Sequence, residues 1–384
     1  MNTVGDVLLV LAGVVVTIAV VDSAVRTFVL PRGASSFVTR FVFRTLGRVF
    51  RGLCKPLNTY EARDRVMALY APTALVGLVV VWVLLVLVAF AFIFRAVVFD
   101  GWADAFEMSG SSLFTLGFVR PPRGGGEWGY VLAFIEAGIG LFLLALLISY
   151  LPTIYGAFSR REVAVARLAA RAGTPPDAVE LLIRYHEIGW LDDLPHLWAE
   201  WESWFSELSE THTTFSILAF FRSPNPHRSW VTSAGAILDS AAFAQSTLQV
   251  PWSPQAGLCI RAGYLALREI AGIYRIPYNA DPAPDDPISI ARAEFMDAYE
   301  RLGGAGVPVR TDRERAWRDY AGWRVNYDGV LLAMAALTTA PYAPWSSDRS
   351  LNVPRRRFGR NPPPLLDPKK WIDPRAGRES RRRR

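Results

Sequence analysis

Three long apolar stretches in the first 160 residues constrain the fold of this chain more than any other feature. They cover residues 7–30, of which 7–21 are nearly unbroken in Val, Leu, Ile and Ala, and then residues 71–94 and 128–155. Each stretch is long enough to cross the hydrocarbon layer of a bilayer as a helix. The sequence therefore predicts a membrane protein of the all-α class.

The charged residues are concentrated after the third apolar stretch, although hydrophobic residues make up 51% of the 384 positions. This division predicts an N-terminal transmembrane helix in residues 1–31, a basic linker in 32–67 and a two-span module in 68–158. An all-helical domain is predicted in residues 159–345. The last part, residues 346–384, is rich in Pro and Arg and is predicted to be a disordered basic tail.

Basic residues between the first two spans set the predicted orientation. Residues 32–67 are rich in Arg, whereas residues 1–6 contain neither Lys nor Arg. Because loops rich in Lys and Arg stay on the cytoplasmic side, the N-terminus is expected outside the cell and the C-terminus in the cytoplasm. The chain is thus predicted to be a multi-pass plasma membrane protein, with its first helix kept as an anchor and not removed as a signal peptide.

The segment between the second and third spans has the pattern of a re-entrant loop. A short amphipathic stretch begins at Trp102 and places Asp104 in its first turn, where the helix dipole favours an acid. Its packing surface is expected to come from Phe106, Met108, Leu113 and Phe114. Non-helical backbone at membrane depth is tolerated only where it is buried in protein or lines water. Residues 102–118 therefore predict a pore helix followed by an ion filter of carbonyl oxygens, formed by Thr115, Leu116, Gly117 and Phe118.

This loop resembles the pore loop of the two-transmembrane potassium channel superfamily. In that family an Asp-Ala-aromatic opening precedes Thr-Val/Leu-Gly-Tyr/Phe-Gly-Asp, and here Asp104-Ala105-Phe106 precedes Thr115-Leu116-Gly117-Phe118. The resemblance covers residues 71–157. It implies a homotetramer permeable to K⁺, because one loop per chain supplies one quarter of a filter. The residues expected to support the pore helix and filter are Asp104, Glu107, Ser112 and Glu136.

Two residues depart from the family pattern at the outer mouth. Val119 stands where the family has its second filter glycine, and Arg120 stands where it has an acid. A β-branched residue rarely adopts a positive φ, so the outermost carbonyl ring is expected to be missing or turned away, and strict K⁺ selectivity is not predicted. Two Arg120 side chains ~8 Å apart would repel by about 2 kcal/mol at an effective dielectric of ~20, so they must splay, bind anions or pair with Glu107 or Glu127.

Glu136, Gly138 and Gly140 lie inside the third span. A carboxylate there costs about 2.5 to 3.5 kcal/mol on insertion scales, so Glu136 is expected to face protein or water. Glu136 is expected to support the filter from behind in preference to lining the ion path. A purely structural alternative is that Glu136 pairs with an Arg at the outer mouth. Gly138 and Gly140 suit either a gating hinge or close helix packing.

A stripe of basic residues runs between the first two spans, at Arg40, Arg44, Arg48, Arg51 and Lys55. The spacing of three and four residues predicts one face of a helix. A voltage sensor would need arginines at every third position of a spanning helix, with other spans to receive them. An amphipathic helix on the cytoplasmic leaflet is expected instead, where each basic residue is worth about 1 kcal/mol against anionic lipid.

The second half of the chain has the apolar spacing of packed helices. A core-facing stripe with helical spacing consists of Leu197, Trp198, Trp201, Trp204, Phe205 and Leu208. The predicted helices cover residues 161–171, 178–188, 194–221, 230–247, 255–274, 288–302 and 312–337. Pro- and Gly-containing breaks separate most of them.

Catalytic and metal-binding motifs are weakly represented in this half. His196 and Glu200 have the i, i+4 spacing of a helix-borne metal pair, but no HExxH or paired CxxC accompanies them. Gly303–Gly306 has no preceding strand and does not predict a dinucleotide-binding turn. Cys54 and Cys259 are expected to be free thiols. The chain is therefore predicted not to be an enzyme and to hold no cofactor or metal, and no ligand of the helical domain is indicated.

Together these patterns predict the pore-forming subunit of a homotetrameric cation channel that the helical domain assembles or regulates. K⁺ is favoured by the resemblance and not by the outer filter residues. Anionic membrane lipids are the expected partners, and nucleic acid is not. The alternative is a non-conducting membrane-anchored scaffold or sensor, in which the loop is degenerate and the helical domain is the working part.

Overall fold

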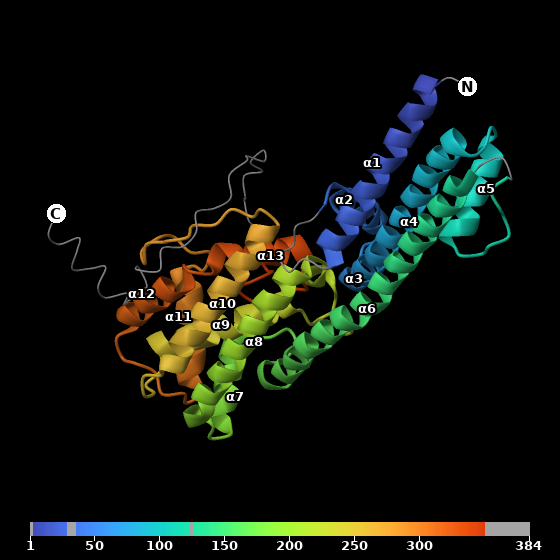
Figure 1. The fold of residues 1–384 in the computed structure, drawn as a ribbon. Coiled ribbons are helices and arrows are strands. Elements are labelled where there is room, and N and C mark those ends of the chain that lie inside the picture. The colour runs from blue at the N-terminus through green and yellow to red at the C-terminus, as the bar shows by residue number, and fades with distance from the viewer. Residues whose placement is uncertain (1–2, 29–35, 123–125, 350–384) are drawn as a thin grey trace, which may run out of the picture.

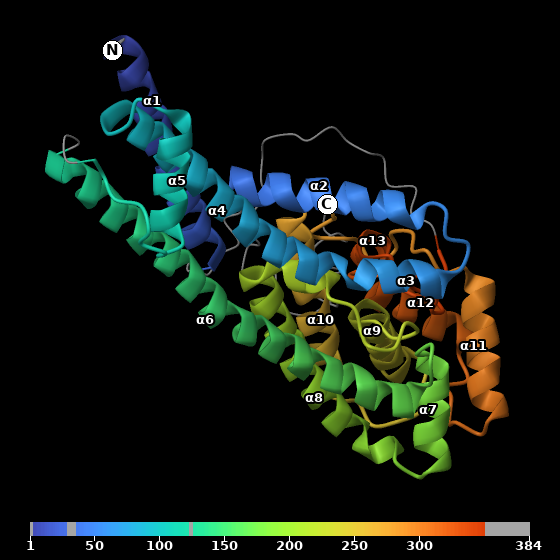
Figure 2. The same ribbon diagram turned by 90° about the vertical axis from the view of Figure 1, so that its right-hand side faces the viewer.

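The computed structural model describes residues 3–28, 36–122 and 126–349. Within these ranges every named element is a helix, and β-pairing is limited to one antiparallel bridge between Leu248 and Val309. The predicted all-α class is therefore confirmed. In both Figure 1 and Figure 2, α1, the short α5 and the start of α6 form one end of the molecule, and the bundle of helices α7–α13 lies toward the other.

Three helices are long and apolar enough to cross a membrane: α1 (Thr3–Phe28), α4 (Tyr70–Val97) and α6 (Gly126–Ala172). They coincide with the three predicted spans, and residues 29 and 30 of the first prediction lie outside the described residues. α4 extends about one turn beyond the predicted end at Phe94. α6 continues without a break past Pro152 and includes the predicted helix 161–171, so one helix joins the two ends of the molecule.

The first span packs closely on the second. A Cβ atom on Gly13 would lie 2.5 Å from the carbonyl oxygen of Ala89, so only glycine allows α1 and α4 to approach this closely. Nearer the other end of α1, the Trp82 indole N–H donates to Ser23 Oγ over 3.0 Å. Both Ser23 and Trp82 are fully buried, so this hydrogen bond satisfies an indole that would otherwise be orphaned.

Helices α2 (Phe37–Cys54) and α3 (Tyr60–Ala68) connect the first two spans. α2 begins after Ser36, whose hydroxyl accepts the Thr39 N–H. Its buried residues include Val42 and Phe50, and the Phe50 ring contacts Tyr70 of α4 at 5.7 Å. One face of α2 is therefore packed on the spans, which leaves its other faces open.

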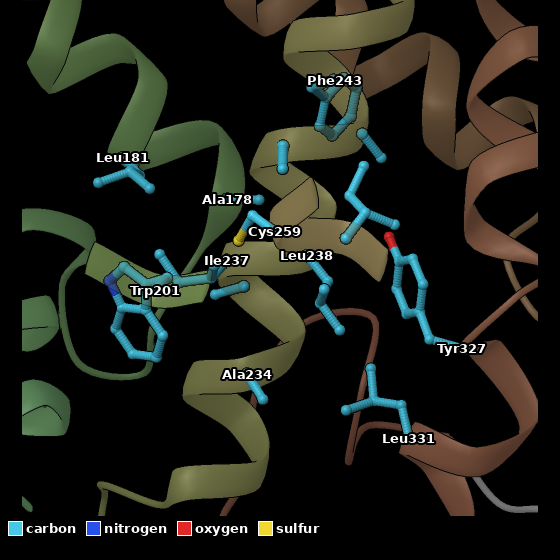
Figure 3. Packing of buried hydrophobic residues seen from close by; sticks show 14 of the residues in the cluster. Ala178, Leu181, Trp201, Ala234, Ile237, Leu238, Phe243, Cys259, Tyr327 and Leu331 are labelled. Atoms are coloured by element: carbon cyan, nitrogen blue, oxygen red, sulfur yellow. The ribbon is translucent and has the colours of Figure 1, made fainter. Parts of the chain in front are cut away.

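The remaining helices form a bundle around α9 (Trp230–Ser246), which is buried along its whole length. Around it lie α7 (Ala178–Glu187), α8 (Leu194–Thr214), α10 (Pro254–Ile273), α11 (Arg292–Gly304), α12 (Arg313–Arg324) and α13 (Asp328–Thr338), with the short 3-10 helices η1 (Leu191–Asp193) and η2 (Ser216–Phe220). Figure 3 shows Ile237 and Leu238 of α9 packed among side chains of neighbouring helices. All six residues of the predicted α8 stripe are buried, which confirms its core-facing role.

A fully buried ion pair joins α9 to α12. The Arg324 guanidinium donates to both carboxylate oxygens of Asp239, at 2.5 and 2.7 Å, and to Asp328 at 2.8 Å. The phenol groups of Tyr320 and Tyr327 donate to the same Asp239 at 3.0 and 2.8 Å. The cluster is thus a hydrogen-bonded polar centre inside an apolar bundle.

Three predicted helix boundaries are wrong. The helix predicted over 194–221 ends at Thr214, because the chain turns into η2 to pack against the spans. The helix predicted over 312–337 is broken at residues 325–327, where Tyr327 leaves helical geometry and its phenol reaches Asp239. The helix predicted from 288 begins only at Arg292.

Candidate functional site

A helix, α5 (Trp102–Leu113), is present where the pore helix was predicted, and it packs between α4 and α6. Asp104 lies in its first turn, as expected. Ala105, Met108 and Leu113 are buried against the two spans. Phe106 of α5 and Phe114, directly after α5, were expected to contribute to this packing, but both are exposed and neither belongs to the core that α5 shares with α4 and α6.

Main-chain N–H groups after α5 point back to two serines at its carboxyl end. The Leu116 N–H donates to the Ser111 carbonyl at 2.8 Å, and the Thr115 N–H donates to the Ser112 carbonyl at 2.9 Å. The Ser111 hydroxyl accepts the Val119 N–H at 3.2 Å. These bonds fix the start and the end of the loop to α5.

Residues with and without a positive φ alternate along the loop. Thr115 has φ +55° and Gly117 has φ +71°, whereas Leu116 and Phe118 do not have positive φ. Such alternation can gather main-chain N–H groups on one side of the chain, and the N–H groups of Thr115, Leu116 and Val119 are bound to α5. A positive φ costs a β-branched residue about 1–3 kcal/mol and persists only where its surroundings impose it, as the hydrogen bonds to α5 do here.

The four predicted filter residues are brought together on an open face. Thr115, Leu116, Gly117 and Phe118 are all exposed, with Leu116 at 61% and Phe118 at 64%. Ser112, behind them, is buried. The loop therefore presents non-helical backbone and apolar side chains to a space that no described part of the same chain fills.

Glu136 lies behind α5 and is fully buried on α6. Its Oε1 is 2.5 Å from Ser109 Oγ, which is also 2.9 Å from the carbonyl oxygen of Leu87 in α4. The single Ser109 proton is either shared between the two acceptors, or given to Leu87 while a protonated Glu136 carboxyl donates to Ser109. In both arrangements Ser109 and Glu136 link all three helices of the predicted pore module.

The other acids considered as supports of the filter or as partners of Arg120 lie on the surface of the described chain. Asp104, Glu107 and Glu127 are exposed, as is Arg120, and no ion pair joins Arg120 to Glu107 or Glu127 in the described chain. The geometry within one chain therefore does not bring together the pairs considered for neutralising Arg120. Val119 is half-buried.

The two glycines of α6 differ in their surroundings. A Cβ atom on Gly140 would lie 2.3 Å from the carbonyl oxygen of Leu113, the last residue of α5. Gly140 therefore allows α6 to touch the end of α5. A Cβ atom on Gly138 would meet nothing within 4 Å. Close packing thus accounts for Gly140, and nothing in the described contacts requires glycine at Gly138.

The basic stripe lies on the open side of α2 and just after it. All its residues are exposed, namely Arg40, Arg44, Arg48, Arg51 and Lys55. Beside them Phe37 and Phe41 are also exposed, with stacked rings 6.4 Å apart. The exposed surface of α2 is therefore both basic and aromatic.

Sequence reasoning missed Ser109 and Ser111, which position Glu136 and the loop. The run Ser109-Gly110-Ser111-Ser112 was a usable signal, since small polar residues between apolar spans need partners for their hydroxyl groups.

The helical bundle offers no recognisable catalytic or metal centre in its described residues. No cluster of three or more His, Cys, Asp or Glu side chains that could hold a metal is found there, and Cys54 and Cys259 are free. A cavity of about 390 Å³ is lined by Asp177, Glu294, Asp297, Arg301 and Trp345, among others. Its mixture of acidic, basic and apolar groups does not single out a ligand class.

No protein-family model matches the chain, and no curated protein or solved structure matches it either.

Proposed function

We propose that the chain is the pore-forming subunit of a homotetrameric channel for monovalent cations, with K⁺ the favoured ion. One observation carries this proposal: four N–H groups of the Thr115–Val119 loop, those of Thr115, Leu116, Gly117 and Val119, are bound to α5, while the other side of the loop is open. Carbonyl oxygens on that open side are the ligands that replace water around an alkali cation in a filter.

Membrane physics supports the presence of further subunits around the loop. Exposed non-helical backbone at membrane depth is unfavourable unless it is buried in protein or faces a water-filled path. Copies of the chain around a common axis satisfy both conditions, because they enclose the loops and leave water between them. The same arrangement would cover Phe106 and Phe114, which one chain leaves exposed.

The residues at the outer mouth support a channel with weak selectivity among monovalent cations. The Val119 N–H is bound to the Ser111 hydroxyl, so the chain turns back towards α5 directly after Phe118. The filter would then offer carbonyl rings from residues 115–118 alone. Fewer carbonyl rings would weaken the discrimination of K⁺ from Na⁺ while still admitting monovalent cations.

The proposed setting is the plasma membrane, with the N-terminus and the filter loop outside and the bundle in the cytoplasm. The exposed basic and aromatic surface of α2 then lies at the inner leaflet, where anionic lipid is the matching partner. Replacing Arg40, Arg44, Arg48 and Arg51 together by Gln should reduce the salt-sensitive preference of the purified protein for anionic over neutral nanodiscs. An unchanged preference would remove lipid binding by α2 from the proposal.

Flux through liposomes tests the main proposal. Reconstituted protein should pass K⁺, and Gly117→Asp should abolish passage, because aspartate both disfavours φ +71° and places a charge in the filter. Gly272→Asp is the matched control, since a Cβ atom there meets open space in the bundle, and it should conduct normally. Native mass spectrometry should show four copies. A monomer, or the absence of flux under every condition, would favour the non-conducting scaffold.

A further inference from the structure

One short segment, Phe215–Arg222, joins the helical bundle to the spans. It contains η2 and lies between α8 and the loop that leads to α9. Its aromatic rings each contact a ring of a span: Phe215 contacts Tyr150 of α6 at 5.1 Å, Phe220 contacts Tyr70 of α4 at 5.5 Å, and Phe221 contacts Tyr155 of α6 at 5.7 Å. Ile217, Leu218 and Phe221 are buried in one core with residues of α4 and α6. The segment therefore touches both long helices of the proposed pore.

Arg161 of α6 holds this segment by its main chain. The guanidinium is buried and donates to the carbonyl oxygens of Leu218 and Phe221, both at 2.8 Å. Glu162 neutralises it at 2.8 Å. Charged hydrogen bonds out of solvent are stronger than neutral ones, so α6 and the segment are fastened together at this point.

His212 of α8 completes the anchor. Its Nδ1 lies 2.9 Å from the Leu208 carbonyl and its Nε2 lies 3.2 Å from an Arg161 nitrogen. Nδ1 must therefore be the donor and Nε2 the acceptor, which makes the imidazole neutral. Burial, together with the charge of Arg161, lowers the pKa of His212 well below its usual range. The anchor therefore keeps one protonation state near neutral pH.

The bundle determines where the segment lies. The phenol of Tyr274, directly after α10, donates to the Ser216 carbonyl. At the other end Arg222 pairs with Asp64 of α3 and donates to the Thr338 carbonyl of α13 at 2.7 Å. A rearrangement of α10 or α13 would therefore move the segment, and with it the helices that it holds.

We propose that Phe215–Arg222 is the mechanical link through which the bundle controls the pore, with Arg161 as the positioning residue that transmits its movement to α6. This inference deepens the proposed function, since it assigns the regulation of the same pore. α6 is one helix from the loop to Arg161, and at Gly140 it touches the end of α5. Pro152 removes one main-chain hydrogen bond between these points and gives α6 a place to bend.

The test compares Arg161→Gln with Arg160→Gln in full-length protein in liposomes. Arg160 is the matched control, because it is the neighbouring arginine and also pairs with α8, through Glu207, but is 62% exposed. Arg161→Gln should accelerate amide hydrogen exchange about tenfold in residues 215–222 and also in 111–119, and should change K⁺ flux at least about threefold. Arg160→Gln should leave all three values at the level of the original protein.

Faster exchange confined to residues 215–222, with exchange in 111–119 and flux unchanged, would overturn the link. Exchange in α9 reports whether the bundle is folded. If Arg161→Gln disrupts the bundle, Phe221→Leu weakens the ring contact of the segment with Tyr155 of α6 and leaves the guanidinium and its main-chain acceptors intact. If the original protein passes no ion, the proposed channel function fails. The exchange comparison still decides whether the segment is coupled to the loop.

Discussion

At the scale of single residues, the loop after α5 and its serine contacts carry the proposed function. Thr115 and Gly117 were expected from the sequence to form a filter, and the structure gives both of them a positive φ. Ser109 and Ser111 could not be expected in the same way. Their role depends on which carbonyl, hydroxyl and carboxyl groups the tertiary structure places within hydrogen-bonding distance.

Glu136 should act as a neutral hydrogen-bond donor. Glu136→Gln keeps a donor at nearly the same position, so K⁺ flux and thermal stability should stay close to those of the original protein. Glu136→Leu removes the donor and leaves Ser109 with one partner, which should cost about 1–3 kcal/mol in stability and reduce flux. Thermal unfolding in detergent and liposome flux measure the two effects. Loss of function in Glu136→Gln equal to that in Glu136→Leu would show that a negative charge is needed.

Arg120 should limit cation entry. Arg120→Gln removes the positive charge that each subunit places beside the filter, so K⁺ flux should rise several-fold in low salt, and about tenfold if the barrier falls by 1.4 kcal/mol. The increase should shrink at high salt, because ions screen exposed charges. Flux at two ionic strengths measures this effect. An increase independent of salt would point to a steric effect of Arg120.

At the scale of elements, hydrophobic periodicity predicted the helices well and tertiary hydrogen bonds decided where they end. The stripe of α8 is buried as predicted, since periodicity reports directly on the buried face. Local sequence does not show that Tyr327 is drawn to Asp239, or that the chain after Thr214 turns to meet the spans. Because of these contacts between residues far apart in sequence, one predicted helix ends early and another is interrupted.

Loss of one partner of the buried Arg324–Asp239 pair should destabilise the bundle more than loss of both partners together. Arg324→Met leaves a buried carboxylate without its cation and should destabilise the bundle by about 3–5 kcal/mol. The double change Arg324→Met with Asp239→Leu should recover much of this loss. Denaturant unfolding followed by tryptophan fluorescence measures it, with Arg315→Met as the exposed control. A loss in the double variant equal to the sum of the single losses would contradict the pairing.

His212 should make the bundle less stable in acid. Its pKa is lowered in the folded protein, so below about pH 6.5 the unfolded chain binds a proton that the folded chain does not. Folding stability should then fall by about 1.4 kcal/mol for each pH unit below that value, with no contribution from His212 above it. His212→Gln should flatten this slope in denaturant unfolding, whereas the exposed His227→Gln should not. Equal slopes in both variants would assign the effect to other groups.

At the scale of the whole molecule, three apolar helices and a helical bundle could be predicted from composition and periodicity. The way in which these parts join could not. The core shared by α4, α6 and residues 217–221 is made of apolar residues that have no special spacing in sequence, and only the folded chain shows that they meet.

Subunit arrangement can be tested at Phe114, which should lie close to the shared axis. In a background with Cys54→Ser and Cys259→Ala, Phe114→Cys should give disulfide-linked dimers under mild oxidation in membranes. Val7→Cys, on the exposed face of α1, should stay monomeric on the same gel. Linked dimers with Val7→Cys and none with Phe114→Cys would contradict the proposal, because they would show that the subunits meet at α1 and not at Phe114.

The 47 residues of α6 make a rod about 70 Å long, more than twice the ~30 Å thickness of the hydrocarbon layer. Pro152 lies about 18 Å along this rod from Gly140, so a bend of about 10° at Pro152 would displace α6 at Gly140 by about 3 Å. That distance is of the size of an alkali cation. In the proposed channel, a bend that leaves the packing of the bundle unchanged would therefore suffice to widen or close the passage for an ion.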